Sequence, residues 1–369
     1  MMATLMTERK RSALTRGHLP RYTPYVIGGS AIVVAAALMS LIGFNVFGWA
    51  VLSAVLFAAG NVTSAAVVEG RRKATDKLAT SLVVGAFLVA LLPLISVIWT
   101  VLINGVPGLL TPGFLSTSMN GVTGAVDNAS VKDGTPVLGG VYHALIGSVL
   151  ITLWATLISV PVGLLTAIYL VEYSGDNYFS KVITFLVDVM TGIPSIVAGL
   201  FAAAFFAMIM GPGTKTGFVA AVALSVLMIP VVVRSSEEML KIVPNELREA
   251  AYALGVRKWR TILKIVIPTA ISGIASGVTL AIARVIGETA PLLVTAGFAS
   301  SINMNVFAGW MSSLPTFIYT QIMTPTSPSN SDPSTQRAWA AALLLIILVM
   351  LLNLGARLVA RLFAPKTGR

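Results

Sequence analysis

The chain alternates between long apolar runs and shorter polar segments. Eight of the runs approach or exceed the roughly 18 residues that a helix needs to cross the hydrocarbon core of a bilayer. They cover residues 25–42, 46–68, 79–102, 144–171, 182–210, 218–233, 266–298 and 338–358. The pattern predicts an all-α, polytopic membrane protein, and the run 266–298 is long enough to include re-entrant backbone.

Basic residues are distributed unevenly between these predicted spans. With the N-terminus in the cytoplasm, the inner segments and the two tails hold 21 of the 25 Lys and Arg residues, if Arg357 at the inner end of the last span is counted with the C-terminal tail. Three lie in outer segments, Lys132, Lys215 and Arg337, and Arg284 lies within a span. Because Lys and Arg concentrate in cytoplasmic loops, this asymmetry predicts a multi-pass protein of the bacterial plasma (inner) membrane with both termini cytoplasmic.

Composition agrees with a membrane protein. Hydrophobic residues make up 56% of the chain and charged residues 11%, which is too apolar for a single soluble core. The net charge of +11 follows from the basic inner loops, so it does not indicate a nucleic-acid partner. There is no Cys, and His18 and His143 are far apart in sequence, each expected in a loop near a membrane boundary. We therefore predict that this chain holds no metal and no cofactor.

The first two runs form a separate N-terminal part. Basic residues precede the first run as in a signal peptide, but only residues 43–45 separate it from the second run, which favours a retained hairpin. We predict a basic segment and transmembrane hairpin over residues 1–75, and a six-span core over residues 76–365.

Two outer segments of the core, residues 104–142 and 299–337, are rich in polar and turn-forming residues. They lack the apolar periodicity of a buried domain. We expect them to be loops that cap the outer face.

The inner segment 235–265 is predicted to form two short helices with a break. Pro244 suits a first helical turn, Glu249 favours the positive end of a helix dipole, and Gly255 suits a left-handed helix end. Small side chains would allow a partner to approach closely, although an ordinary surface helix would have the same features. The residues assigned to this docking surface are Glu249, Ala250, Ala251 and Gly255.

The chain contains no Gly-x-x-x-x-Gly-Lys-Ser/Thr phosphate-binding loop. If transport through it is driven by nucleotide, the nucleotide must be held by a separate subunit.

A charged pair lies inside the seventh run. Arg284 and Glu288 are four residues apart, so we predict that they share one helix face about one turn apart. Ionised side chains are costly in hydrocarbon, so both should face protein or an aqueous path. In one interpretation, the guanidinium of Arg284 donates hydrogen bonds to an oxyanion and Glu288 holds that guanidinium in place, with Thr289 next to them in sequence. In the other, the two charges form a structural ion pair.

Two positions are predicted to interrupt helices beside this path. Gly287 and Pro291 break the seventh run, and Pro194 with Ser195 breaks the fifth. Broken helices inside membranes are tolerated where they line a cavity, and their free amide groups suit an anion. Packing kinks are the alternative explanation.

Four segments carry a resemblance to a known family. The first is residues 247–268, with Glu-Ala-Ala, three residues, Gly, nine residues and Ile-x-Leu-Pro, in which Ile267 replaces Leu. This resembles the cytoplasmic coupling loop of bacterial ABC importer permeases. With residues 191–201 (TGIPSIVAGLF), 233–240 (VRSSEEML) and 283–293 (ARVIGETAPLL), the chain resembles the PstA-type permease subunits of phosphate-specific ABC importers over about residues 75 to 362.

That resemblance implies a type I (MetI-like) six-span permease core that forms part of the path for inorganic phosphate. It also implies partners: a second, PstC-like permease, two copies of a PstB-like ATPase that carry ATP and Mg, an external PstS-like phosphate-binding protein and membrane lipid. The chain itself is then expected to be no enzyme. The N-terminal hairpin departs from the family pattern, and its role stays open.

Other functions remain as alternatives. A permease for another oxyanion, such as sulfate or molybdate, is the nearest. An ion-coupled secondary transporter has no use for a docking helix, and a signalling or scaffold protein has no use for Arg284 and Glu288 inside a span.

Overall fold

The structure is a computed structural model that describes residues 17–175 and 177–363. Every regular element in this described part is a helix. The elements are α1 (Thr23–Ile42), α2 (Val46–Val68), α3 (Arg71–Leu109), α4 (Gly124–Asp133), α5 (Tyr142–Ile168), η1 (Tyr169–Tyr173), α6 (Tyr178–Thr191), α7 (Ser195–Met210), α8 (Gly217–Ile242), α9 (Asn245–Ala253), α10 (Lys258–Thr261), η2 (Ile262–Val266), α11 (Ile267–Val285), α12 (Ala290–Thr295), α13 (Leu314–Met323) and α14 (Asp332–Phe363).

Among the described residues, seven helices are long and apolar enough to cross a membrane, and the bent pair α6 and α7 raises the number to eight. The prediction of an all-α, polytopic protein is confirmed. The chain divides into two compact units, Met1–Trp99 and Thr100–Arg369, with the division inside α3. The predicted domain boundary after residue 75 stays a prediction.

In the first unit, α1 and α2 pack as an antiparallel hairpin. Asn45 caps α2 by accepting hydrogen bonds from the backbone N–H groups of Phe47 and Gly48. Gly60 lets the two helices approach, because a Cβ there would lie 2.6 Å from Ile27. The predicted hairpin is therefore formed, with α3 following it after Gly70.

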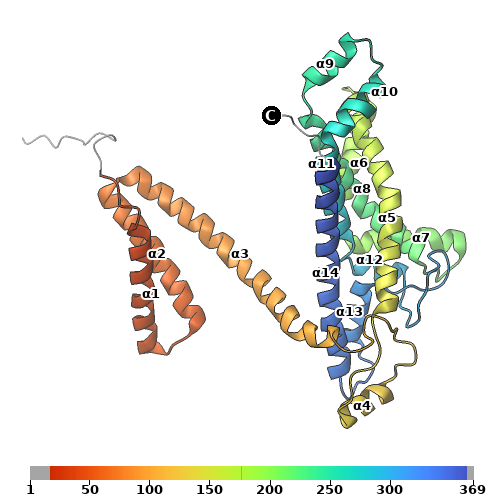
Figure 1. The fold of residues 1–369 in the computed structure, drawn as a ribbon, viewed down its shortest axis with the longest axis horizontal. Helices are drawn as coiled ribbons and strands as arrows, with labels where there is room; N and C mark the ends of the chain where they lie inside the picture. The colour runs from red at the N-terminus through yellow and green to blue at the C-terminus, as the bar shows by residue number, and fades with distance from the viewer. Residues whose placement is uncertain (1–16, 176, 364–369) are drawn as a thin grey trace, which may run out of the picture. The chain divides into compact units, whose positions relative to one another are not determined.

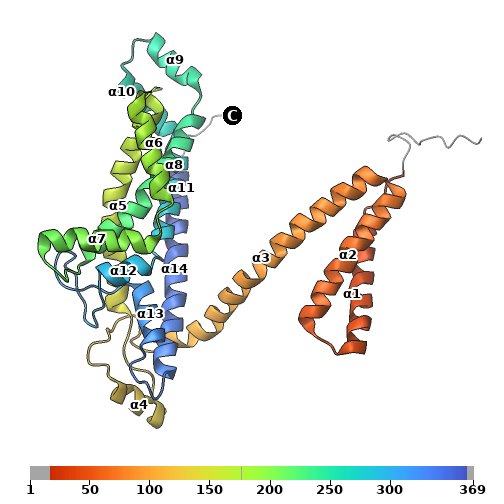
Figure 2. The same ribbon diagram turned by 180° about the vertical axis from the view of Figure 1, so that it is seen from behind.

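In the second unit, the long helices α5, α8, α11 and α14 run lengthwise beside one another (Figure 1). Among the helices long enough to span a membrane by themselves, α8 is the most enclosed, because 67% of its 18-residue apolar stretch is buried. Its face packs with α5 and α11 in a core that includes Ile151, Leu224, Met228 and Val285. Helices α9 and α10 lie at one end of this unit and α4 at the opposite end, while α7 lies across the long helices (Figure 2). We call these the α9 end and the α4 end.

The fifth predicted run forms a bent pair of helices rather than one continuous helix. The run 182–210 is divided into α6 and α7, which are bent by 108° at the break between Thr191 and Ser195. Pro194 has no N–H to continue the helix and restricts the residue before it. It precedes α7 with φ −59° and ψ 137°. The helix break predicted at Pro194 is thus confirmed, and it is sharper than a kink.

The two outer segments predicted as loops each contain a helix. Helix α4 lies within residues 104–142 and α13 within residues 299–337. A capping box begins α13, in which the side chains of Ser313 and Thr316 each accept a hydrogen bond from the other's backbone N–H. The capping residues Ser313 and Thr316 are visible in the sequence. The loop prediction relied instead on apolar periodicity, which is weak in helices of only ten residues such as α4 and α13.

His143 was also misplaced by the sequence. It lies in the first turn of α5, is 1% exposed, and neither ring nitrogen has a hydrogen-bond partner. Its ring makes an edge contact with Phe317 at 5.4 Å between centroids. His143 is therefore part of the apolar packing between α5 and α13 rather than a loop residue.

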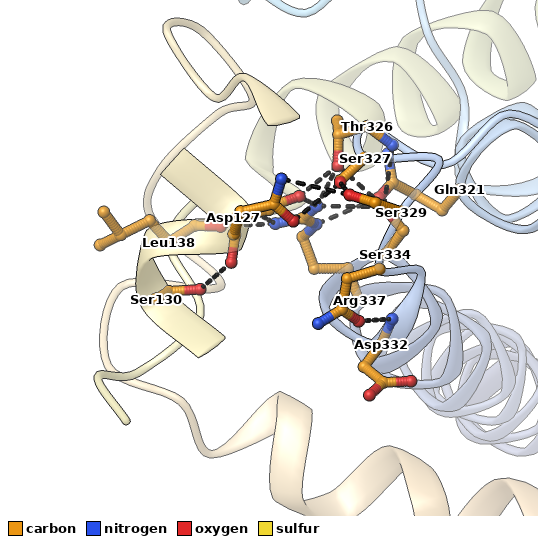
Figure 3. A network of polar contacts seen from close by, with 12 residues as sticks. Asp127, Ser130, Leu138, Gln321, Thr326, Ser327, Ser329, Asp332, Ser334 and Arg337 are labelled. Carbon is orange, nitrogen blue, oxygen red and sulfur yellow. Dashed lines mark hydrogen bonds and ion pairs between the residues drawn. The ribbon is translucent and has the colours of Figure 1, made fainter. Parts of the chain in front are cut away.

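A buried ion pair joins the outer segments to α14 at the α4 end (Figure 3). The Arg337 guanidinium donates to both carboxylate oxygens of Asp127, at 2.9 and 2.5 Å, and the two side chains are 2% and 1% exposed. Arg337 also donates to Gln321 Oε1 at 3.0 Å and to the carbonyl oxygen of Leu138 at 2.8 Å. The guanidinium of Arg337, which lies on α14, therefore holds α4, α13 and the loop at Leu138 together.

The charge state of Asp127 depends on these donors. Burial alone raises the pKa of its carboxyl, but the hydrogen bonds from Arg337 and Thr326 and the charge of Arg337 outweigh burial and lower the pKa below its ordinary value of 3.8. A carboxyl with a lowered folded-state pKa contributes stability above its unfolded pKa and loses it as the pH falls through the folded value. This ion pair should therefore persist down to strongly acidic pH.

We expect Asp127→Asn to destabilise the second unit by about 3–5 kcal/mol, because it leaves the buried Arg337 charge without its partner. Denaturant unfolding of the purified full chain measures this change. Asp133→Asn, which alters an exposed carboxylate on the same helix, is the matched control. Equal stability of the two variants would contradict the assignment.

Candidate substrate path and coupling surface

Helix α11 ends before the charged segment is complete. Its last residue is Val285, and the backbone N–H groups of Ile286 and Glu288 donate to Ile282 and Val285 at 3.0 and 3.1 Å. Helix α12 begins only at Ala290. The helix break predicted at Gly287 is confirmed, and the seventh run consists of a long apolar helix followed by the short helix α12.

The depth of Arg284 follows from the packing of α11 against α8. A Cβ at Gly273 would lie 2.2 Å from the Met239 sulfur, and one at Gly277 would lie 2.4 Å from Ser235 Oγ, so the two helices run antiparallel. Continuing the same register places Arg284 level with Met228. Met228 is near the middle of α8 and belongs to the central core cluster. Arg284 therefore lies about halfway along the helical bundle.

The predicted arrangement of Arg284 and Glu288 on one helix face is wrong. Helix α11 ends at Val285, between the two residues, so they do not lie on one continuous helix. Neither side chain makes a hydrogen bond or an ion pair within residues 17–175 and 177–363, and Arg284 is exposed while Glu288 is half-buried. Neither the structural ion pair nor the holding of the Arg284 fork by Glu288 is formed. Thr289, also half-buried, immediately precedes α12.

The two interrupted helices meet each other. Helix α7 packs on α12, where a Cβ added to Gly199 would lie 2.6 Å from the Pro291 Cα atom. Gly199 and Pro291 are both buried, while Pro194 is exposed and Ser195 is half-buried at the start of α7. The helices that follow the breaks at Pro194 and Gly287, α7 and α12, therefore pack against each other.

The coupling segment has the predicted form of two helices with a break. Helix α9 covers Asn245–Ala253 and α10 covers Lys258–Thr261. Gly255 lies between them with φ +71°, which an L side chain rarely adopts. Glu249, Ala250 and Gly255 are exposed at the α9 end. Pro244 precedes α9 rather than beginning its first turn.

Ala251 differs from the other three docking residues. It is 4% exposed because it shares the inner face of α9 with Arg248, three positions earlier. Its side chain therefore supports α9 from within the chain and does not face outward.

Arg248 attaches α9 to the rest of the unit. Its guanidinium donates to Glu172 Oε1 through Nε at 3.0 Å and NH2 at 2.8 Å, and the side chains are 12% and 4% exposed. It also donates to the carbonyl oxygens of Leu240 and Val243 at the end of α8. Because a helix end leaves carbonyls without intrahelical donors, one side chain both caps α8 and links α9 to η1.

A second group of charges joins α6 to α8 near the same end. Arg234 is hydrogen-bonded to Asp188 and, at 2.8 Å, to Glu237, which accepts from Lys241 at 2.6 Å. Asp188 is 60% exposed, so this contact contributes little to stability. It nevertheless gives Asp188, to which the sequence assigned no role, a defined partner.

The apolar helices described above indicate a membrane protein, and comparisons with known proteins agree with this class. Residues 159–369 match the family model described as "Binding-protein-dependent transport system inner membrane component". Together with the apolar helices, this match makes the chain a multi-pass inner membrane permease subunit of an ABC transport system.

Individual relatives narrow the class. The "Phosphate transport system permease protein PstA 1" of Mycobacterium tuberculosis (strain H37Rv) is 46% identical over 78% of this chain and 88% of that protein. The "Phosphate transport system permease protein PstA" of Pasteurella multocida is 38% identical over 78% of this chain and 95% of that protein. The chain belongs to the PstA family of permeases, which confirms the resemblance found from its motifs.

A solved structure of the MetNI methionine ABC transporter in an inward-facing conformation also resembles the chain. It is 21% identical and covers 61% of this chain and 94% of that chain, with a TM-score of 0.47.

We expect Glu172→Gln to loosen α9 while leaving the spans inserted, because it removes the charge that holds Arg248 in a largely buried site. Hydrogen–deuterium exchange of residues 244–254 should increase by about tenfold or more, since breaking a buried pair costs several kcal/mol. Glu246→Gln, on the same helix but exposed and unpaired among the described residues, is the control. Unchanged exchange in Glu172→Gln would mean that Arg248 does not hold α9.

Proposed function

We propose that this chain forms part of the translocation path for inorganic phosphate in an ATP-driven importer, with Arg284 as the anion ligand inside the membrane. The observation that carries the proposal is a guanidinium level with the middle of α8, exposed and with no protein partner among the described residues. An unpaired cation at such a depth is costly unless it faces water or an anion. Arg suits a phosphate oxyanion because its donors form a planar fork.

We assign three further residues, Glu288, Thr289 and Ser195, to a weak, releasable site. Glu288 and Thr289 follow Arg284 in the break, and Glu288 is assigned the role of limiting anion affinity through its negative charge. Ser195 begins α7, and the first N–H groups of a helix lack intrahelical acceptors. An anion path needs attraction that is sufficient for entry and weak enough for release.

The coupling surface supports ATP as the energy source. Glu249, Ala250 and Gly255 lie outward at the α9 end, and we assign them to docking of an ATPase subunit, with Ala251 supporting the helix beneath. The proposed assembly has two copies of a PstB-like ATPase carrying ATP and Mg, a PstC-like second permease and an external PstS-like binding protein. This chain binds no cofactor and performs no hydrolysis.

The proposed orientation follows from the distribution of basic residues. Both termini and the α9 end are cytoplasmic, and the α4 end is external. The relatives named above carry phosphate transport in their names, and this favours phosphate over sulfate or molybdate.

We expect Arg284→Gln to abolish phosphate uptake while the assembled complex keeps its normal abundance, because the substitution removes the anion ligand and no buried ion pair. Uptake of labelled phosphate, normalised to inserted protein, measures this effect, and Arg284→Lys should retain part of the activity. Lys132→Gln, an exposed cation on α4, is the control. Wild-type uptake in Arg284→Gln would exclude Arg284 from the path.

The charge of Glu288 gives a second variant on the same site. If Glu288 tempers anion affinity, then adding Glu288→Gln to Arg284→Gln should not restore uptake. Recovery in the double variant would instead mean that the two charges act as a structural pair in the working transporter.

We expect Glu249→Lys and Gly255→Asp to leave the protein inserted but uncoupled from its ATPase. The first reverses a charge on the outward face of α9, and the second forces a side chain onto a backbone with φ +71°. Co-purification of the ATPase and phosphate uptake measure the effect, with Asp133→Lys at the opposite end as the control. Undiminished co-purification together with undiminished uptake would refute the docking surface.

A further inference from the structure

The first unit contains a cavity between α1, α2 and α3. Its volume is about 360 Å³, within the range of roughly 300–1,000 Å³ that is common for ligand pockets. The lining residues come from all three helices and are mostly apolar: Pro24, Ala54, Phe57, Ala58, Asn61, Lys77, Thr80, Ser81, Val84, Gly85 and Leu88.

A polar side chain without a partner lies in this lining. Asn61 is 8% exposed, in the last third of α2, and its amide makes no hydrogen bond to any described residue. The amide atoms of Asn61 are open to the cavity, and in a membrane no water is present to satisfy an amide that lacks a protein partner. This indicates that a ligand with a hydrogen-bonding group completes the site.

The polarity of the cavity changes along its length. Asn61 and Lys77 are each eight residues from Glu69, which lies between α2 and α3. Thr80 and Ser81 follow within one turn of Lys77. Farther from the turn, the lining is formed by Phe57, Val84 and Leu88. The cavity is therefore polar near the α2–α3 turn and apolar beyond it.

The charge around the polar end is positive. Between residues 17 and 77 there are five cations and two anions, Glu69 and Asp76, which gives a net charge of +3. Lys77 is paired with Glu69 at 3.1 Å, but its side chain is still 32% exposed. Arg71, Arg72 and Lys73 at the start of α3 are all exposed. A basic cluster at the end of a spanning helix favours an anionic lipid headgroup.

We propose that this cavity is a binding site for an anionic phospholipid. Lys77 and the exposed basic residues before it bind the headgroup phosphate, the Asn61 amide donates to an acyl ester carbonyl, and the chain lies along Phe57, Val84 and Leu88. The site lies outside the proposed phosphate path.

Gly85 offers a direct test of the site. It lines the cavity, and a Cβ added there meets no atom within 4 Å, so Gly85→Leu should fill the cavity without disturbing the fold. Gly29→Leu is the matched control, since Gly29 also has open space around its Cβ position, lies in a helix and does not line the cavity.

The experiment uses the full chain, purified and delipidated, and titrated with phosphatidylglycerol or with phosphatidylcholine of the same acyl chains. Bound lipid is counted by native mass spectrometry. The wild type and Gly29→Leu should bind one phosphatidylglycerol at least about fivefold more tightly than phosphatidylcholine, the ratio expected from about 1 kcal/mol per basic residue at a membrane surface. Gly85→Leu should lose this bound lipid.

Two further variants separate the roles of the lining residues. Lys77→Gln should weaken phosphatidylglycerol binding about fivefold and phosphatidylcholine binding less, because choline balances the phosphate charge of phosphatidylcholine. Asn61→Leu keeps a similar volume and should weaken both lipids, and it serves as the test if Gly85→Leu fails to insert. Wild-type binding in either Gly85→Leu or Asn61→Leu, or equal affinity of the wild type for the two lipids, would overturn the proposal. A photo-crosslinker at Leu88 that captures a protein rather than lipid in the assembled complex would also overturn it.

Discussion

An ionised side chain within hydrocarbon has to be compensated by protein, water or a ligand, and Arg284 is where this constraint is strongest in the second unit. Its helix ends one residue later, and the following break separates it from the nearest acid in sequence, Glu288. The protein thus keeps a cation at mid-depth without neutralising it internally. The same break provides irregular backbone, which a membrane protein tolerates only where it is covered by protein or lines a cavity.

The packing of the helices in the second unit depends on close contacts at small residues. Gly199 at Pro291, Gly163 at Val232 and Gly277 at Ser235 are positions where an added Cβ would lie between 2.4 and 2.7 Å from a neighbouring atom. Association of helices in lipid relies on such contacts between small residues, because apolar side chains gain little by leaving lipid for protein. The interrupted helices α7 and α12 are held against each other by one of them, so the two breaks belong to one assembly.

The ion pairs of the second unit differ in burial, and the two most buried pairs each attach a short helix to the rest of the unit. Asp127 with Arg337 is buried at the α4 end, and Glu172 with Arg248 is largely buried at the α9 end. Each pair secures a short helix that has too few residues to be stable by itself. The pair of Asp188 with Arg234 is more exposed and joins two helices that already pack together. Both ends of the unit are therefore fixed by internal ion pairs, whereas Arg284 in the middle has no partner among residues 17–175 and 177–363.

The sequence alone determined the class of the fold, the number and approximate limits of the spans, the break at Pro194 and the two-helix form of the coupling segment. These features depend on length, hydropathy and local backbone preference, which are properties of consecutive residues. Only the tertiary structure decided the 108° bend between α6 and α7 and the burial of Ala251 and His143. It also decided which charges pair: Asp127 and Arg337 are 210 positions apart, and Glu172 and Arg248 are 76 apart. A single sequence gives no local signal for such partners, because they are selected by the packing of helices that are distant along the chain.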